Sequence, residues 1–116
     1  DIKEAIDRRD AGKSDAAFHA LRALESAIKI LSDELALTRG TERGAAEYID
    51  NLVSAKNGRF VDAWEAEHLK LLFRSLRNPL GHGAGSSAPM QLSHVQSTWA
   101  IEQAMSWIKS LVRRKT

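Results

Sequence analysis

Apolar residues recur along the chain at the spacing of α-helices, and they nowhere alternate with polar residues over the length of a strand. A short first helix is predicted over residues 2–9. A long second helix is predicted from a cap at Ser14 or Asp15 to about Leu37, with Gly40 as its stop. Small residues on this helix would let another helix approach closely. Its inward stripe is Leu21, Leu24, Ile28, Leu31 and Leu35, and the small residues are Ala17, Ala20, Ala23 and Ala27.

Two further helices are predicted in the middle of the chain. The third covers residues 42–56 and ends at Asn57 and Gly58, and the fourth begins at a capping box of Asp62 and Glu65. Both have apolar residues at helical spacing, which predicts one inward face each. These residues are Ala45, Ile49, Leu52 and Val53 on the third helix, and Leu69, Leu72, Phe73 and Leu76 on the fourth.

A loop rich in glycine and serine separates the fourth helix from the last one. Pro79 disfavours helical geometry in the residue before it, so the fourth helix is expected to stop at about Arg77 and the loop to cover residues 79–89. Ser93-His94-Val95-Gln96 is a second capping box, which predicts a last helix reaching about Arg114. The pattern therefore predicts an all-α bundle of four or five helices, with all 116 residues in a single domain.

The last helix has more apolar residues than one core contact needs. Its predicted inward stripe is Ile101, Ala104, Met105, Ile108, Leu111 and Val112. Trp99 and Trp107 flank the opposite side, around Gln103, Ser106 and Ser110. Two interpretations remain open. The tryptophans lie partly buried at the edges of the core, or they form a second helix-packing surface for a dimer or for a missing part of a longer chain.

The net charge of +2 conceals an uneven distribution along the chain. Residues 1–67 carry 14 acidic and 10 basic side chains, whereas residues 68–116 carry 7 basic side chains and the single acid Glu102. No acidic residue lies between His68 and Ile101. A basic C-terminal half favours a polyanionic partner.

The composition excludes several classes of protein. A chain with 43% hydrophobic and 28% charged residues is typical of a globular domain. Without cysteine, it has no disulfide, thiolate metal site or cysteine nucleophile. No apolar run approaches the roughly 18 residues of a membrane span, and no signal peptide is present, so we expect no membrane contact and a cytoplasmic location. Since the chain lacks an initiator Met, we expect it to be the C-terminal part of a longer protein, in contact with a preceding domain.

The four histidines give no indication of a metal site. His19, His68, His82 and His94 do not occur in HxxxH or HExxH spacing. We therefore predict neither a metal nor a cofactor, and a metal hydrolase is the least supported class of enzyme.

The strongest candidate for chemistry is the segment from Arg77 to His82, where a helix ends before a glycine-rich turn. Arg77 supplies a permanent planar cation that suits a phosphate, and His82 supplies an imidazole that suits proton transfer near neutral pH. Asn78 adds a neutral donor and acceptor between them. The alternative interpretation is a helix C-terminus stopped by proline and glycine, with Arg77 capping carbonyls and His82 incidental.

Basic residues precede this segment at helical spacing. Lys70, Arg74 and Arg77 are separated by four and three residues, which predicts one face of an α-helix pointing toward His82. Such a face would bind a polyanion such as RNA. A second basic cluster closes the chain at Lys109, Arg113, Arg114 and Lys115, and it suits either the negative end of a helix dipole or a second anion site.

The order of these segments resembles the HEPN superfamily, in particular its abortive-infection C-terminal branch. Arg77-Asn78-Pro79-Leu80-Gly81-His82 fits the R-polar-x3-H form of the family motif, and the extension His82-Gly83-Ala84-Gly85 resembles that branch's HG-containing turn. Ala23-Leu24-Glu25-Ser26-Ala27-Ile28-Lys29 is similar to its A-x-E-x-x-x-K helix, and the last helix resembles its tryptophan-containing helix. The resemblance covers about Ala16 to Arg114.

The resemblance implies a helical domain that dimerises and places two Arg/His motifs in one shared cleft. It implies a metal-independent endoribonuclease of a prokaryotic anti-phage or toxin-type defence protein, with Arg77, Asn78 and His82 as catalytic residues. His82 would activate the RNA 2′-hydroxyl or protonate the leaving oxygen, and Arg77 would stabilise the transition state. The expected RNA contacts are Lys70, Arg74, Gly83 and Gly85. The alternative is a non-catalytic HEPN module that mediates dimerisation or binds nucleotide or RNA, attached to another effector domain.

Overall fold

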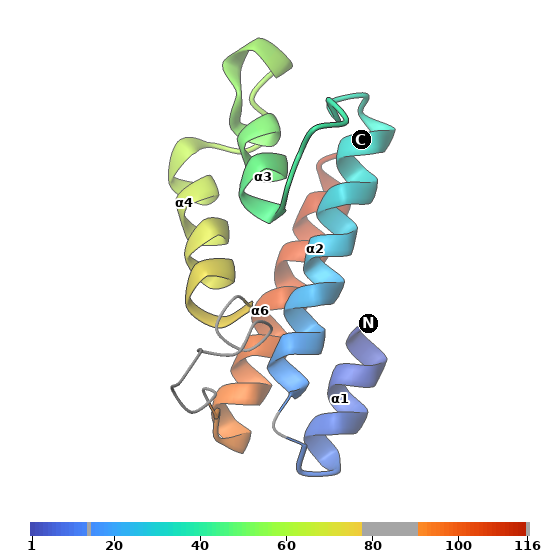
Figure 1. The fold of residues 1–116 in the computed structure, drawn as a ribbon, viewed down its shortest axis with the longest axis vertical. Helices are drawn as coiled ribbons and strands as arrows, with labels where there is room; N and C mark the ends of the chain where they lie inside the picture. The colour runs from blue at the N-terminus through green and yellow to red at the C-terminus, as the bar shows by residue number, and fades with distance from the viewer. Residues whose placement is uncertain (14, 78–90, 116) are drawn as a thin grey trace.

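The computed structural model describes residues 1–13, 15–77 and 91–115, with Arg77 described by its backbone alone. These residues form five α-helices and two short helical turns, with no strand among them, so the predicted all-α bundle is confirmed. In chain order the elements are α1 (Ile2–Asp10), α2 (Ala16–Glu34), α3 (Ala45–Val53), η1 (Ala55–Asn57), α4 (Ala63–Leu72), η2 (Phe73–Arg77) and α6 (His94–Arg113) (Figure 1). Within these residues, none of the helices has the length and apolar character that crossing a membrane requires.

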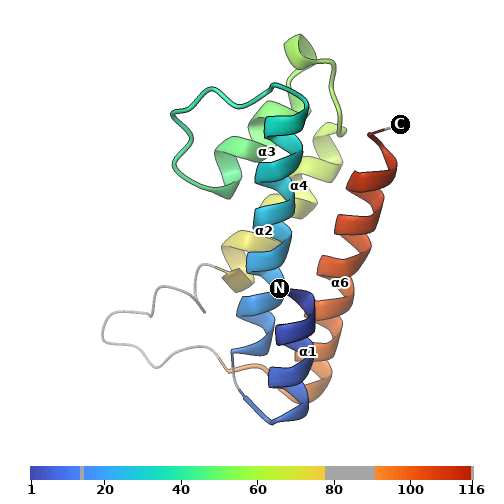
Figure 2. The same ribbon diagram turned by 90° about the vertical axis from the view of Figure 1, so that its right-hand side faces the viewer.

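Helix α2 is the centre of the bundle. It packs against α1, α3, η2 and α6, so that the other elements surround it (Figure 1). Figure 2 shows α1 beside the first half of α2 and beside α6. Ala17 and Ala20 are completely buried in α2. Two of the four small residues predicted to face a neighbouring helix are thus buried, whereas Ala23 and Ala27 are half-buried.

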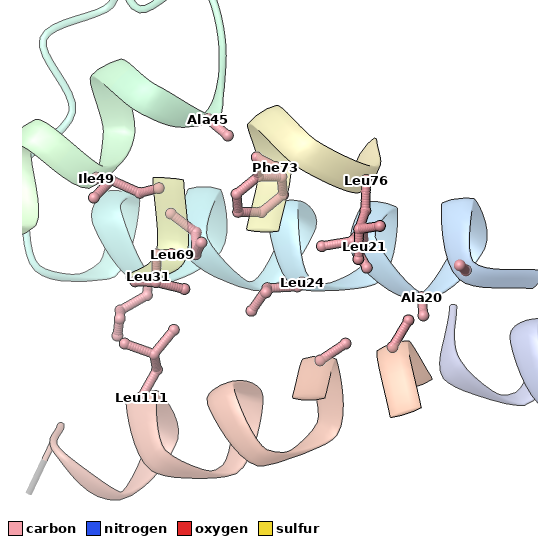
Figure 3. Packing of buried hydrophobic residues seen from close by; sticks show 14 of the residues in the cluster. Ala20, Leu21, Leu24, Leu31, Ala45, Ile49, Leu69, Phe73, Leu76 and Leu111 are labelled. Atoms are coloured by element: carbon pink, nitrogen blue, oxygen red, sulfur yellow. The ribbon is translucent and has the colours of Figure 1, made fainter. Parts of the chain in front are cut away.

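The hydrophobic core lies on both sides of α2. Leu21, Leu24, Ile28 and Leu31 of α2 are buried, as the stripe predicts. Figure 3 shows side chains of α3, α4 and η2 on one side of this row and Leu111 of α6 on the other. The buried residues contributed by the surrounding elements include Ile49, Leu52, Leu69, Phe73, Leu76, Ile101, Ala104 and Leu111.

Helix α2 ends three residues before the predicted position. The backbone N–H of Leu37 donates to Ser32 O at 2.8 Å, and that of Ala36 donates to Asp33 O at 3.1 Å. This is the hydrogen-bond pattern of a Schellman motif, in which the residue after the helix adopts left-handed geometry. Ala36 occupies that position with φ of 59°, so the helix stops there and not at Gly40.

Helix α3 begins three residues after the predicted position because Glu42 holds the preceding loop. Its carboxylate accepts hydrogen bonds from Arg39 N at 2.7 Å and Gly40 N at 2.9 Å, and from Asn51 Nδ2 of α3 at 2.6 Å. The residue therefore caps the turn, and α3 starts only at Ala45. Helix α3 ends at Val53, three residues before the predicted end at residue 56, and the chain continues into η1, whose C-cap Gly58 has φ of 91°.

Both predicted capping boxes are present. Asp62 N donates to Glu65 Oε1 at 2.9 Å at the start of α4. Gln96 N donates to Ser93 Oγ at 3.1 Å, and Ser93 N donates to Gln96 Oε1 at 2.9 Å, at the start of α6. Reciprocal bonds of this kind satisfy two otherwise unpaired donors of a helix N-terminus.

The inward face of α6 differs from the prediction at one end. Ile101, Ala104 and Leu111 are buried, and Met105 and Ile108 are half-buried. Val112, however, is 55% exposed. It is rotated by about 100° from Leu111 and lines a shallow groove between α2 and α6. The buried face instead includes Ser97 and Ala100 near the start of the helix.

Candidate functional site

The predicted catalytic segment begins where the described helix ends. Arg77 is the last residue of η2, which follows α4 directly in the chain. Asn78, His82, Gly83 and Gly85 lie outside the described residues. The juxtaposition of Arg77 with His82 therefore stays a prediction.

The turn that carries Arg77 is a π-helix over residues 73–77. A π-helical turn pairs residues five apart, so the chain rotates less per residue than in an α-helix. The single basic face was predicted from α-helical spacing throughout. Past Phe73 that spacing no longer places Arg77 in line with Lys70. Single π-turns of this kind occur frequently at functional sites.

The two basic residues on the N-terminal side of Arg77 differ in their surroundings. Lys70 lies at the end of α4, and its Nζ is 2.5 Å from Asp50 Oδ1 of α3. Arg74 is exposed on η2 and forms no ion pair with a carboxylate of the described residues. Arg74 therefore presents its charge to solvent, whereas the charge of Lys70 is already compensated.

The described histidines occupy three separate places. His19 lies on α2 and its side chain faces α1. Its Nε2 is 3.4 Å from Asp15 Oδ2, and its Nδ1 is 4.0 Å from Glu4 Oε1 of α1. His68 is exposed on α4, where its ring meets that of Trp64 edge-on, and His94 is exposed at the start of α6. Across residues 1–13, 15–77 and 91–115, no group of three or more potential ligands is placed to hold a metal ion.

A groove of about 380 Å³ lies between α4 with η2 on one side and α6 on the other. The α4–η2 wall consists of His68, Leu71, Leu72, Ser75 and Leu76. The α6 wall consists of Trp99, Gln103 and Trp107. Trp99 is 46% exposed and Leu71 is 52% exposed. We refer to this feature as the tryptophan groove.

An ion pair ties α6 to α4 near Trp107. Arg114 Nη1 donates to Glu65 Oε1 at 2.9 Å, and the second guanidinium nitrogen contacts Glu65 Oε2, so the pair is bidentate. The Arg114 guanidinium beside Glu65 lowers the pKa of that carboxyl below its ordinary value, against the effect of burial. The guanidinium also lies 6.0 Å from the centre of the Trp107 ring. Lys115 makes a further ion pair with Glu34 of α2.

These contacts give Arg114 and Lys115 of the C-terminal basic cluster a structural role. Arg114 ties the end of α6 to α4, and Lys115 ties it to α2. They thus act as structural partners for acidic residues of the first half of the chain.

The two tryptophans of α6 behave differently from each other. Trp107 is half-buried and packs against the core, as the first interpretation predicts. Trp99 is exposed in the groove. The spacing of Trp99, Gln103 and Trp107 indicates one side of a helix, but no pattern in the sequence predicts that His68 and Leu71 form the opposing wall. No local signal shows that α4 lies opposite α6.

Comparison of the chain with models of protein families, with curated protein sequences and with solved structures finds no match.

Proposed function

We propose that this chain is a metal-independent endoribonuclease domain of the HEPN type, from a prokaryotic defence protein, with Arg77, Asn78 and His82 as its catalytic residues. The observation that carries the proposal is the position of Arg77. It ends the π-helical turn of an all-helical bundle, directly before the segment that completes the motif. The same stretch of sequence, from His68 to Ile101, contains no acidic residue. An anionic substrate meets the least electrostatic repulsion there.

The chemistry proposed is cleavage of RNA by its own 2′-hydroxyl. The 2′-oxygen forms a bond to the adjacent phosphorus, and the bond from phosphorus to the 5′-oxygen breaks. The products are a 2′,3′-cyclic phosphate and a 5′-hydroxyl. His82 takes the proton from the 2′-hydroxyl or gives one to the leaving oxygen, and Arg77 stabilises the additional negative charge on phosphorus. Asn78 orients the substrate.

The proposal includes a homodimer in which two such motifs share one cleft. A single arginine and a single histidine supply one cation and one proton-transfer group. A second copy would supply the other proton-transfer group that the reaction uses. Analytical ultracentrifugation of the protein is the direct measurement of this part of the proposal, with a dimer expected.

The decisive experiment measures cleavage of a single-stranded RNA in the presence of EDTA. We expect the wild-type protein to cleave and the Arg77→Ala and His82→Ala variants each to lose at least about 100-fold in rate, the usual contribution of a group that stabilises transition-state charge or transfers a proton. Arg43→Ala and His94→Ala are matched controls, since both remove the same side-chain types from exposed positions outside the motif. The controls should cleave at the wild-type rate.

Two results would overturn the catalytic assignment. Cleavage by an Arg77→Ala/His82→Ala double variant at the wild-type rate would remove both residues from the mechanism. A wild-type protein that binds RNA without cleaving it would instead support the alternative, a non-catalytic HEPN module that dimerises or binds RNA. Loss of cleavage on addition of EDTA would contradict the metal-independent mechanism.

A further inference from the structure

The tryptophan groove has a definite polarity along the bundle. Helix α4 and helix α6 run in opposite directions, and the Glu65–Arg114 pair fixes their register at one end (Figure 1). Because the two helices are antiparallel, the Trp107 end of the α6 wall lies toward the start of α4, and the Trp99 end lies toward η2. Ser75 and Leu76 directly precede Arg77. The exposed tryptophan is therefore at the end of the groove nearer to the backbone of Arg77.

The two tryptophans are held differently, which suits one of them for a ligand. Trp107 packs against the core and has the Arg114 guanidinium near its ring. Trp99 is not among the residues packed against the core, and nearly half of its surface is exposed. An aromatic ring in this position presents a flat apolar surface on which another ring can stack.

The polar groups of the groove suit the edge of a heterocyclic base. His68, Ser75 and Gln103 line it, and each can donate and accept hydrogen bonds. The Gln103 side chain makes no hydrogen bond with any residue that the structure describes, so its amide is available to a ligand. The volume of about 380 Å³ lies within the range of small-ligand sites.

The lining of the groove carries no charge that would repel a nucleic acid. No carboxylate lines it, and Glu65, nearer the start of α4, is compensated by Arg114. Exposed Arg74 directly precedes the lining residue Ser75 on η2. Arg74 is therefore an exposed cation on the same turn as this wall, and it has no carboxylate partner among the described residues. Stacking on an aromatic ring beside such a cation is the common mode of single-strand binding.

We propose that the tryptophan groove binds a nucleobase of single-stranded RNA, stacked on Trp99 with its edge toward Gln103 and Ser75. The inference rests on the proposed function and deepens it, because it assigns a base subsite next to the catalytic segment. Stacking is tolerant of base identity, so the groove holds the strand in place with little preference for sequence.

The test measures binding of a single-stranded 2′-O-methyl oligonucleotide, which lacks the nucleophilic hydroxyl and stays intact. Trp99→Ala should weaken its affinity by about 5- to 150-fold, the usual effect of removing one stacking partner. Trp99→Tyr keeps an aromatic ring and should restore affinity to within about threefold of wild type. Trp64→Ala is the matched control, because Trp64 is 63% exposed on α4 outside the groove, and its loss should leave affinity unchanged. Circular dichroism verifies that each variant is folded.

A second readout reports stacking directly. Tryptophan fluorescence of the wild-type protein should be quenched by the oligonucleotide, and most of this quenching should disappear in Trp99→Tyr. Equal affinity of wild type and Trp99→Ala would overturn the inference. A change of oligomeric state in Trp99→Ala with unchanged affinity would also overturn it, and would identify the groove as a protein interface.

Different results would contradict the assignment of the groove and the assignment of the nuclease. If Trp99→Ala binds and cleaves like wild type while Arg77→Ala does not cleave, the groove assignment is wrong and the nuclease stands. If the wild-type protein does not cleave RNA, yet Trp99→Ala loses oligonucleotide binding, the groove stands as the site of a binding module.

Discussion

Glu42 shows how one side chain decides the course of the backbone. Its side chain is fully covered, and its carboxylate accepts hydrogen bonds from two backbone amides of the loop and from the Asn51 side chain. Hydrogen bonds to the ionised form stabilise it. Those bonds, the one from the Arg39 amide above all, lower the pKa of Glu42 from 4.5 to about 2.

This lowered pKa predicts how the stability of the protein depends on pH. The pKa in the folded state lies below that in the unfolded state, so the contribution of Glu42 is complete above about pH 4.5 and is lost as the pH falls toward 2. Glu42→Gln should therefore unfold at a lower urea concentration than wild type at pH 7. The difference between the two midpoints should shrink between pH 4.5 and 2.

Comparison with a second variant separates this effect from a general loss of negative charge. Glu67→Gln removes a carboxylate from an exposed position on α4 and should leave the urea midpoint close to that of wild type at every pH. A difference between wild type and Glu42→Gln that is the same at pH 7 and pH 2.5 would contradict the role of the ionised carboxylate.

At the scale of the elements, the starts of α4 and α6 were predictable and the boundary between α2 and α3 was not. The capping boxes at Asp62 and Ser93 are local, since each depends on two side chains three residues apart. The end of α2 has no such signature. Ala36 is a good helix former, and its left-handed geometry places the following Leu37 against the core.

The strained geometry of Ala36 gives a prediction. An L-residue with a side chain pays about 1–2 kcal/mol in the left-handed region, whereas glycine adopts it readily at an entropic cost of about 0.5–1 kcal/mol. Ala36→Gly should therefore raise the free energy of unfolding by about 0.5–1 kcal/mol, measured by chemical denaturation.

The same substitution in a right-handed position should have the opposite sign. Ala46 is exposed in the first turn of α3, and Ala46→Gly should lower the free energy of unfolding by about 0.5–1 kcal/mol. Two variants that both destabilise the protein would show that Ala36 does not end α2 in left-handed geometry.

The candidate site was predictable in its residue types and not in its geometry. The motif from Arg77 to His82 and the acid-free stretch around it are properties of the sequence alone. The π-helical turn could not be predicted, because the spacing argument assumes the α-helical period throughout. Phe73 and Leu76 can be buried in the core in an α-helical turn as well as in a π-helical one. The opposing walls of the tryptophan groove depend on how two helices far apart in the chain lie against the bundle. No local pattern of residues contains that information.

At the scale of the whole molecule, the uneven charge of the two halves contributes to the fold itself. Among the residues that the structure describes, ion pairs join acids of residues 1–67 to bases of residues 68–116. They include Asp50–Lys70 between α3 and α4, Glu65–Arg114 between α4 and α6, and Glu34–Lys115 between α2 and the end of α6. Lys70, Arg114 and Lys115 are thus occupied by partners within the molecule.

This arrangement predicts which cations contribute to RNA binding. Release of counterions makes the logarithm of affinity fall linearly with the logarithm of salt concentration, by about 0.7 per phosphate contact for a single strand. Arg74→Gln should therefore weaken binding of the 2′-O-methyl oligonucleotide and reduce this slope by about 0.7. Lys70→Gln should have a smaller effect, because a phosphate must displace Asp50 from the Lys70 ammonium before contact.

Lys56→Gln provides the control for a loss of positive charge as such. Lys56 is exposed on η1, at the far end of α4 from the proposed site (Figure 1), and its replacement should leave the slope unchanged. The measurement is oligonucleotide affinity at several salt concentrations for the three variants and wild type. Equal losses for all three variants would mean that RNA responds only to the total charge of the chain. A loss confined to Arg74→Gln would instead locate the phosphate contact on η2, beside both Ser75 of the tryptophan groove and Arg77.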